Sequence, residues 1–176
     1  MSEQSREGRD GPEMPAGRGY KMTGAGSTVV PVAPAELWAI IMDERRLAAA
    51  IPGAETLRRV DEGQGRAYAA DVGIGVGRLK GIYRVSAVFA DMAEPESLVL
   101  LGGAEGPFGR SSGEGWIDLA PVAGGTEVRY RYALLIKGMV AAAGGRLLDK
   151  AAATLIEKFF SRLARAVGED GATPQP

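Results

Sequence analysis

The sequence predicts an α+β fold, in which a curved antiparallel sheet of seven strands surrounds one long C-terminal helix and two short helices follow the first strand. Three observations predict it. Six runs of residues between 54 and 138 alternate apolar and polar side chains, as strands do. The breaks between these runs are of hairpin length, which makes the sheet antiparallel. Near the C-terminus, apolar residues recur at helical spacing.

The first strand and the two short helices come first along the chain. Residues 20–30 (YKMTGAGSTVV) read as a short strand that ends in β-branched residues. Pro34 marks the start of a helix, in which apolar residues recur every three or four positions. Asp43 can cap a second short helix, which Pro52 ends.

The six strand-like runs have one apolar and one polar face. They are AETLRRV, GRAYAADVGI, LKGIYRVSAVFADM, ESLVLLGGAEG, SSGEGWIDLA and TEVRYRYALLIKG. In the last run, Val128, Tyr130 and Tyr132 share one face. Glu127 and Arg129 lie on the other, so the sheet has one face against a core and one in water.

The long helix is predicted over residues 147–167. Its apolar stripe consists of Leu148, Ala152, Leu155, Phe159, Leu163 and Ala166. Most charged residues lie off this stripe, so the stripe must cover the apolar face of the sheet. Many residues at the start of the helix are Ala or Gly. Opposite a curved sheet they leave free volume, or else they only let helix and sheet approach closely.

The glycine-rich stretch DVGIGVGRLKGIY, residues 71–83, raises the question of a phosphate-binding loop. Such loops work because a helix N-terminus follows at once and directs its amides at the anion. Here the residues after Gly77 alternate like a strand, so the stretch predicts a hairpin. Whether residues 77–80 sit at the mouth of a cavity is a separate question.

Composition excludes several functional classes. Lys+Arg number 21 against 22 Asp+Glu, without a basic block for nucleic acid. The chain has no His and no Cys, which removes thiol nucleophiles, Ser-His-Asp triads and nearly all zinc sites. Residues 1–18 and 168–176 are predicted to be disordered tails around one domain, 19–167. No signal peptide and no apolar stretch of about 20 residues is present, so we expect a cytoplasmic protein.

One segment resembles a known family. Residues 32–57 (VAPAELWAIIMDERRLAAAIPGAETL) carry Ala33-Pro34, Trp38, Asp43, Leu47 and Ile51-Pro52-Gly53. The segment resembles the opening of the G-subunit family of carbon monoxide dehydrogenase, within the START-like or Bet v 1-like helix-grip superfamily. VGRLKGIY is similar to the strand-turn of that family, and TEVRYRYALLIKGMVAAAGGRLL with KFFSRLA is similar to its end. The resemblance covers roughly residues 21–167.

The resemblance implies an accessory protein rather than an enzyme. It implies a pocket between sheet and helix for a hydrophobic small molecule, such as a quinone or lipid, and no metal or other cofactor. It also implies association with a molybdenum hydroxylase of the carbon monoxide dehydrogenase type, and a part in coupling that enzyme to the membrane. Such a protein would be cytoplasmic, with a peripheral contact at the inner face of the cytoplasmic membrane as a further expectation.

The candidate pocket residues are apolar and aromatic side chains predicted to point inward. They are Trp38, Ile41, Tyr83, Val85, Phe89, Leu100, Phe108, Ile117, Tyr130, Tyr132, Leu148, Leu155 and Phe159. Plain core packing is the alternative for each. A buried phenol needs a partner, so Tyr130 or Tyr132 could bond the carbonyl of a head group, or else a group at the sheet rim. Arg110 and Ser111 could line a pocket mouth or a solvated turn.

Two other functions stay open at this point. The same fold could be an enzyme, such as a cyclase or hydrolase acting on an apolar substrate, which would require an inward-facing ionisable residue. It could also be an assembly factor that uses the outer sheet face or the rim to deliver or mature a partner enzyme. In that case the volume of the pocket is incidental.

Overall fold

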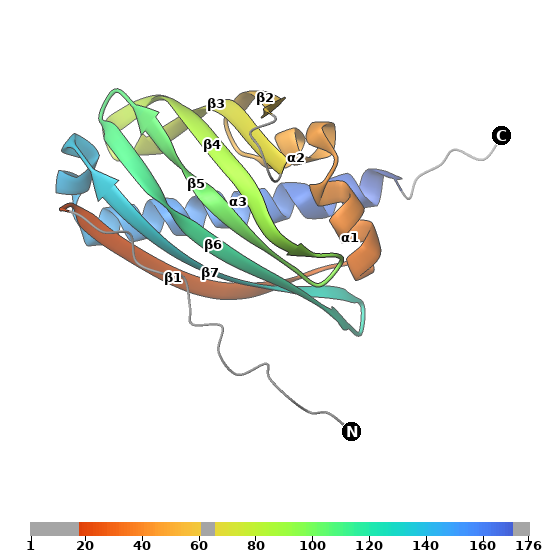
Figure 1. Ribbon diagram of the computed structural model, residues 1–176. Coiled ribbons are helices and arrows are strands. Elements are labelled where there is room, and N and C mark those ends of the chain that lie inside the picture. Colours follow the sequence, from red (N-terminus) through yellow and green to blue (C-terminus); the bar gives the residue numbers. More distant parts are fainter. Residues whose placement is uncertain (1–17, 61–65, 171–176) are drawn as a thin grey trace.

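One curved sheet and a long helix across it make up the fold in the computed structural model, which describes residues 18–60 and 66–170 (Figure 1). The elements are β1 Tyr20–Val30, α1 Pro34–Ile41, α2 Glu44–Ala50, β2 Ala54–Val60, β3 Arg66–Val76, β4 Leu79–Ala93, β5 Ser97–Gly106, β6 Gly109–Val122, β7 Gly125–Lys137, the 3₁₀ helix η1 Met139–Ala143 and α3 Gly145–Asp170. This order confirms the predicted fold class. The predicted tails, 1–18 and 168–176, lie mostly outside the described residues and stay predictions, although α3 includes residues 168–170.

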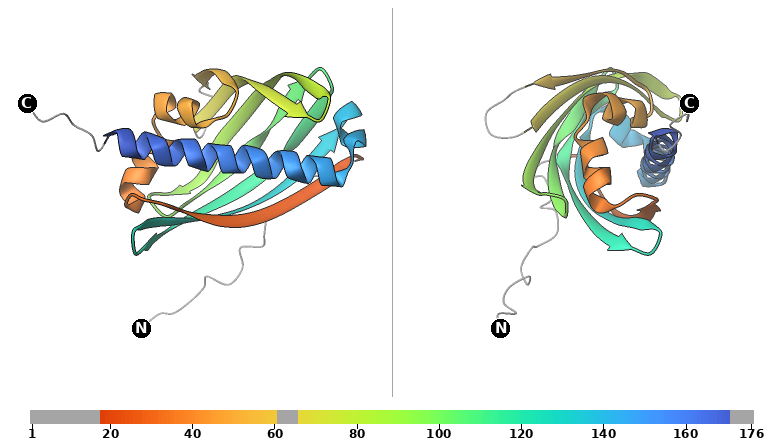
Figure 2. Two further views of the ribbon diagram at one scale, coloured as in Figure 1. Left: turned by 180° about the vertical axis from the view of Figure 1, so that it is seen from behind. Right: turned by 90° about the vertical axis from the view of Figure 1, so that its right-hand side faces the viewer.

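The sheet has seven antiparallel strands in the order β1-β7-β6-β5-β4-β3-β2. Each strand from β2 to β6 pairs with the next along the chain, and β1 pairs with β7. Viewed from the end, the sheet curls and α3 lies along its open side (Figure 2). Because successive side chains of a strand alternate between faces, Tyr83 and Phe89 of β4 are buried, whereas Arg84 is exposed.

The two short helices begin and end where the sequence predicts. Pro34 occupies the first turn of α1. The Asp43 carboxylate caps α2, since Oδ1 accepts hydrogen bonds from the backbone N–H groups of Arg45 at 3.0 Å and Arg46 at 3.1 Å. After α2, Gly53 adopts a φ of +75°, a conformation that favours glycine. Its carbonyl accepts a 2.9 Å hydrogen bond from the N–H of Gly73, which ties the end of α2 to β3.

Buried side chains form two clusters at opposite ends of the hollow. The larger one, here the α1/α2 core, lies where the short helices meet the sheet and the second half of α3. Its most buried members are Val30, Leu37, Trp38, Ile40, Ala50, Tyr68, Phe89, Leu98, Val128 and Leu163. The smaller one, here the η1 cluster, consists of Met22, Val76, Ile136, Val140 and Leu148. Side chains therefore fill one end of the hollow densely and the other end sparsely.

Thr126 joins β7 to the segment before α1, and its replacement by valine is expected to destabilise the protein. Thr126 is 0% exposed, and its hydroxyl donates a 2.6 Å hydrogen bond to the carbonyl of Val32. Thr126→Val leaves that carbonyl without its donor, at a cost of about 1–3 kcal/mol in the free energy of unfolding. Urea denaturation measures the loss. Thr126→Ser keeps the hydroxyl and serves as the control; equal stability of the valine variant and the parent would contradict this role.

Candidate ligand-binding site

An apolar pocket lies inside the hollow at its sparsely filled end. Its volume is about 170 Å³. The sheet contributes Met22, Ile74, Val76, Tyr83, Ala104, Arg110, Ser111, Leu134 and Ile136, and the helices contribute Val140, Leu148, Ala151, Ala152 and Leu155. The two alanines of α3 face the pocket with a single methyl group each, and larger side chains there would fill the space. Small residues on the helix thus leave free volume opposite the curved sheet.

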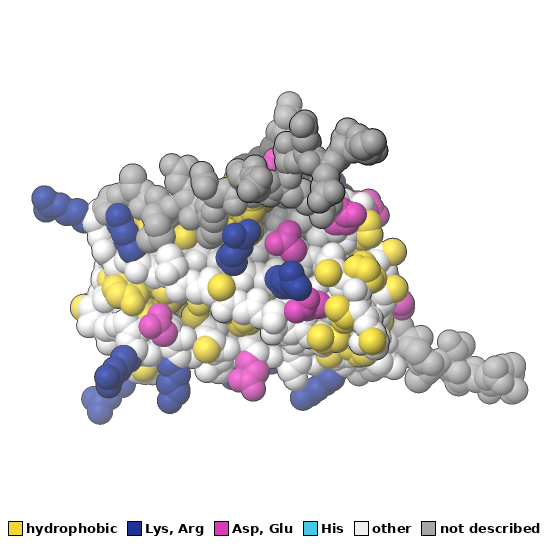
Figure 3. Space-filling model, turned by 90° about the horizontal axis from the view of Figure 1, so that it is seen from below, with side chains coloured by type: hydrophobic (Ala, Val, Ile, Leu, Met, Phe, Trp, Pro, Cys, Tyr) yellow, Lys and Arg dark blue, Asp and Glu magenta, His cyan; other side chains and the backbone are white. Residues whose placement is uncertain are grey.

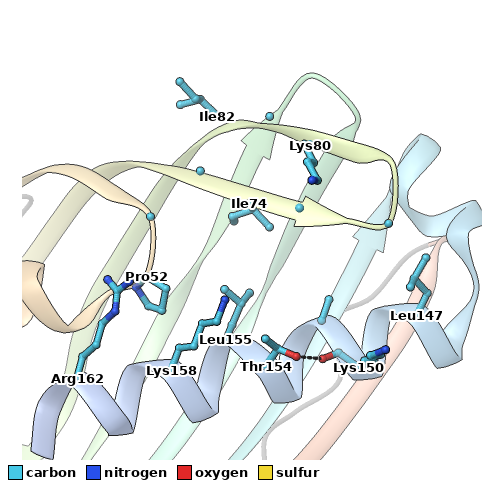
Figure 4. Close-up of a pocket in the computed structure, with 16 residues that line it drawn as sticks. Pro52, Ile74, Lys80, Ile82, Leu147, Lys150, Thr154, Leu155, Lys158 and Arg162 are labelled. Atoms are coloured by element: carbon cyan, nitrogen blue, oxygen red, sulfur yellow. Dashed lines mark hydrogen bonds between the residues drawn. The ribbon is translucent and has the colours of Figure 1, made fainter.

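A second, wider space opens between α3 and the hairpin of β3 and β4 (Figure 4), and is called the basic groove below. Its volume is about 840 Å³. The residues that line it are Pro52, Gly53, Gly73, Ile74, Gly75, Gly77, Lys80, Gly81, Ile82, Leu147, Lys150, Ala151, Thr154, Leu155, Lys158 and Arg162. Ile74, Ala151 and Leu155 line both spaces, so the groove adjoins the apolar pocket.

The sizes of the two spaces limit what they can hold. A cavity of about 150 Å³ accommodates a molecule the size of benzene. The apolar pocket, at about 170 Å³, can therefore enclose one ring or a short chain. Ligand sites for larger molecules have volumes of about 300–1,000 Å³. A quinone with a side chain or a lipid must therefore occupy the pocket and the groove together.

The glycine-rich stretch at residues 71–83 forms the hairpin beside this groove, as the sequence predicts. β3 ends at Val76 and β4 begins at Leu79, with Gly77 at a φ of +58° in the turn. A Cβ on Gly77 would lie 3.0 Å from Cδ2 of Leu147, so the hairpin tip approaches the first turn of α3. Gly77 and Lys80 both line the basic groove, which places residues 77–80 at its mouth.

The two tyrosines of β7 lie over glycines of the neighbouring strand. Tyr132 lies opposite Gly24 of β1 and Tyr130 opposite Gly26, and a Cβ on either glycine would collide with the phenol. Tyr130 also stacks on Phe160 of α3, with ring centroids 5.7 Å apart. Burial raises the pKa of the Tyr132 phenol, and the charges of Asp149 and Tyr130 raise it further, so this hydroxyl stays protonated at neutral pH.

The structure distributes the predicted pocket residues among several places. Tyr83, Leu148 and Leu155 line the apolar pocket. Phe108 and Tyr132 pack against the η1 cluster, and Val85 is half-buried on β4. Members or neighbours of the α1/α2 core are Trp38, Ile41, Phe89, Leu100, Ile117 and Phe159. Tyr130, the last of the predicted residues, stacks on Phe160 of α3. That the residues outside the pocket lining contact a ligand stays a prediction.

Sequence reasoning missed two sets of site residues, each of which had a signal. Ile74 and Val76 continue the inward alternation of Tyr68 and Val72, although the glycines between and beside them are more typical of a turn. The basic residues of α3 in the groove, Lys150, Lys158 and Arg162, were assigned only to positions off the apolar stripe. Their spacing of eight and four, with Thr154 between the first two, places them on one helix face.

Comparisons with known proteins identify the family. The family model for the G subunit of carbon monoxide dehydrogenase (CoxG) matches residues 26–168. The chain belongs to the CoxG family. A structural relative of this CoxG chain is a conserved protein from Geobacillus kaustophilus, with 32% sequence identity and a TM-score of 0.78. That match covers 84% of this chain and 96% of the other.

More distant structures share the fold of this CoxG chain. A Zhui aromatase/cyclase from Streptomyces sp. R1128 is 13% identical with a TM-score of 0.67, and the match covers 89% of this chain and 100% of that one. Ara h 8.0201 is also 13% identical, with a TM-score of 0.62 and coverage of 85% and 99%. At such identities they show the helix-grip fold alone. A search of curated protein sequences gave no match.

In residues 18–60 and 66–170, none of the helices is both long enough and apolar enough to cross a membrane.

Proposed function

We propose that this CoxG-family chain is a binding protein for a hydrophobic small molecule, a quinone or a lipid-like compound, held between the sheet and α3. The observation that carries the proposal is the apolar pocket, which lies under α3 and adjoins the basic groove. The guest would extend from Leu148 and Ile136 at the inner end toward Leu155 at the shared opening. Burial would provide most of the affinity, at about 0.8 kcal/mol for each CH₂ removed from water.

The lining favours a carrier over a catalyst. Among the described residues, no carboxylate lines the apolar pocket. General acid–base chemistry on an apolar substrate needs an ionisable group within hydrogen-bond reach of the reacting atom. The polar residues that line the pocket are Tyr83 of β4 and Arg110 and Ser111 of β6, which can donate hydrogen bonds to a guest. We therefore propose that the chain binds its guest without transforming it.

We also propose the partners that the family name suggests. The chain would associate with a molybdenum hydroxylase of the carbon monoxide dehydrogenase type and couple it to the membrane. Met139, 62% exposed, and Leu147, 37% exposed, support a peripheral membrane contact because both belong to the helical segments beside the pocket. A carrier with its opening near a membrane could exchange a lipophilic guest without releasing it into water.

Affinity is expected to rise with the length of the apolar guest. In a titration with alkyl-substituted quinones or alcohols, each added CH₂ should tighten binding about fourfold until the pocket and groove are full. Native mass spectrometry of the purified protein should also detect a bound apolar molecule. Affinity that does not change with chain length, together with a ligand-free mass, would overturn the binding proposal. Failure to co-purify with a hydroxylase would overturn the proposed coupling alone.

A further inference from the structure

We infer that the guest is an anionic amphiphile, whose apolar tail fills the pocket and whose carboxylate or phosphate head group lies in the basic groove. This inference rests on the proposed function and narrows it, because it selects a charged, lipid-like ligand over a neutral quinone. It is carried by the charge of the groove and by the position of the groove next to the apolar pocket, with which it shares three lining residues.

Four cations line the groove, and no carboxylate is among its described lining residues. Lys150, Lys158 and Arg162 come from one face of α3, and Lys80 comes from β4 on the opposite side. Within the described part of the chain, no ion pair joins any of the four to an acidic side chain. An anion in the groove would therefore lie beside three cations of α3, with Lys80 at the hairpin, and none of the four has an acidic partner among the described residues.

This concentration of charge does not follow from the composition. The whole chain carries a net charge of −1. On the face seen from below, acidic and basic side chains are intermixed (Figure 3). The groove, in contrast, gathers four basic residues around one opening. An opening lined by charges of one sign raises the local concentration of oppositely charged ligands.

The groove walls also place the charges at the correct end of the site. The stem of Lys80 lies over Gly75 of β3, where a Cβ would be 3.2 Å from its Cγ, so glycine leaves room for the lysine at the hairpin. On α3, Lys158 and Arg162 extend toward the hairpin side, above the position where Leu155 faces the pocket (Figure 4). Most residues that line the pocket are apolar, whereas four basic residues line the groove, which matches a molecule with an apolar tail and an anionic head.

The test compares three probes with the same alkyl chain: dodecanoate, dodecyl phosphate and dodecan-1-ol. Binding to the full chain is measured by calorimetry at low and high salt. We expect both anions to bind about tenfold more tightly than the alcohol at low salt, and most of this advantage to disappear at high salt. Equal affinities for all three would overturn the anionic head group and leave the proposed function intact. No binding of any probe would overturn both.

Substitutions then test whether the preference for anions comes from the basic residues of the groove. The triple variant Lys150→Gln, Lys158→Gln and Arg162→Gln should weaken dodecanoate binding about tenfold and leave dodecan-1-ol unchanged. The matched control removes three exposed arginines elsewhere, Arg58→Gln, Arg84→Gln and Arg165→Gln, and should change neither affinity. Equal losses in the two triple variants would assign the effect to net charge and overturn the inference.

Two further measurements test whether the groove instead binds a free anion or an anionic membrane. If inorganic phosphate binds and the groove variant abolishes it while dodecanoate binds no better than dodecan-1-ol, the groove takes a free anion. If the groove variant loses binding to phosphatidylglycerol vesicles but keeps its affinity for dodecanoate, the groove docks on an anionic membrane. Either result would overturn the inference.

Discussion

Replacing Ala151 with phenylalanine is expected to weaken binding of the hydrophobic guest strongly. Ala151 lines both the apolar pocket and the basic groove, so a ring at this position would occupy the passage between them. If the ring excludes three methylene groups of the guest from the pocket, at about 0.8 kcal/mol each, affinity falls about sixtyfold. Titration with a long-chain alcohol measures the loss without any contribution from charge.

Ala153→Phe is the matched control for this variant. Ala153 lies two residues further along the same helix, and it is exposed. The same substitution there adds the same ring to α3 outside the pocket, and guest affinity should not change. Thermal unfolding of both variants shows whether the helix still packs on the sheet. An Ala151→Phe protein that is folded and binds the guest as tightly as the parent would show that the guest lies elsewhere.

Truncation of Leu163 is expected to cause the largest loss of stability. Leu163 is 1% exposed and belongs to the α1/α2 core, where the second half of α3 meets the short helices. Leu163→Ala removes buried methyl groups and leaves a cavity, which costs about 2–5 kcal/mol in the free energy of unfolding. Chemical denaturation at equilibrium measures this loss.

Leu147→Ala is the control for Leu163, since Leu147 is on the same helix and 37% exposed. We expect its cost to stay below about 1 kcal/mol, as for most partly exposed positions. Under conditions in which Leu163→Ala remains folded, its affinity for a long-chain alcohol should match that of the parent, because Leu163 lines neither space. A stability loss as small as that of the control would contradict the central place of Leu163 in the core.

Much of the fold could be predicted because its determinants are local. Asp43 caps α2 through two backbone N–H groups only two and three residues away. The alternation in β4 and β7 and the stripe of α3 are periodic patterns that any strand or helix shows when one side is buried. The helix itself is longer than the predicted 147–167, from Gly145 to Asp170, because terminal turns lack the apolar pattern that marks its interior.

The site could be predicted only in part because its shape depends on contacts between distant segments. An inward-facing residue is equally compatible with a filled core and with a cavity wall, and the difference depends on what lies opposite. Trp38 and Phe89 face other large side chains in the α1/α2 core, whereas Tyr83 lies across from the alanines of α3. The groove arises where residues 74–80 of the hairpin meet α3, a meeting that neither segment reveals alone.

The α1/α2 core lies away from the apolar pocket, and this separation affects how the protein would behave over repeated binding and release of a guest. The most buried leucines lie away from the guest, so the empty form keeps the contacts that hold the sheet and α3 together. Loading and unloading then require no refolding, and a donor and an acceptor would meet the same rigid body. A shuttle of this kind can be reused, and its cargo preference can be altered through the wall residues while the framework stays intact.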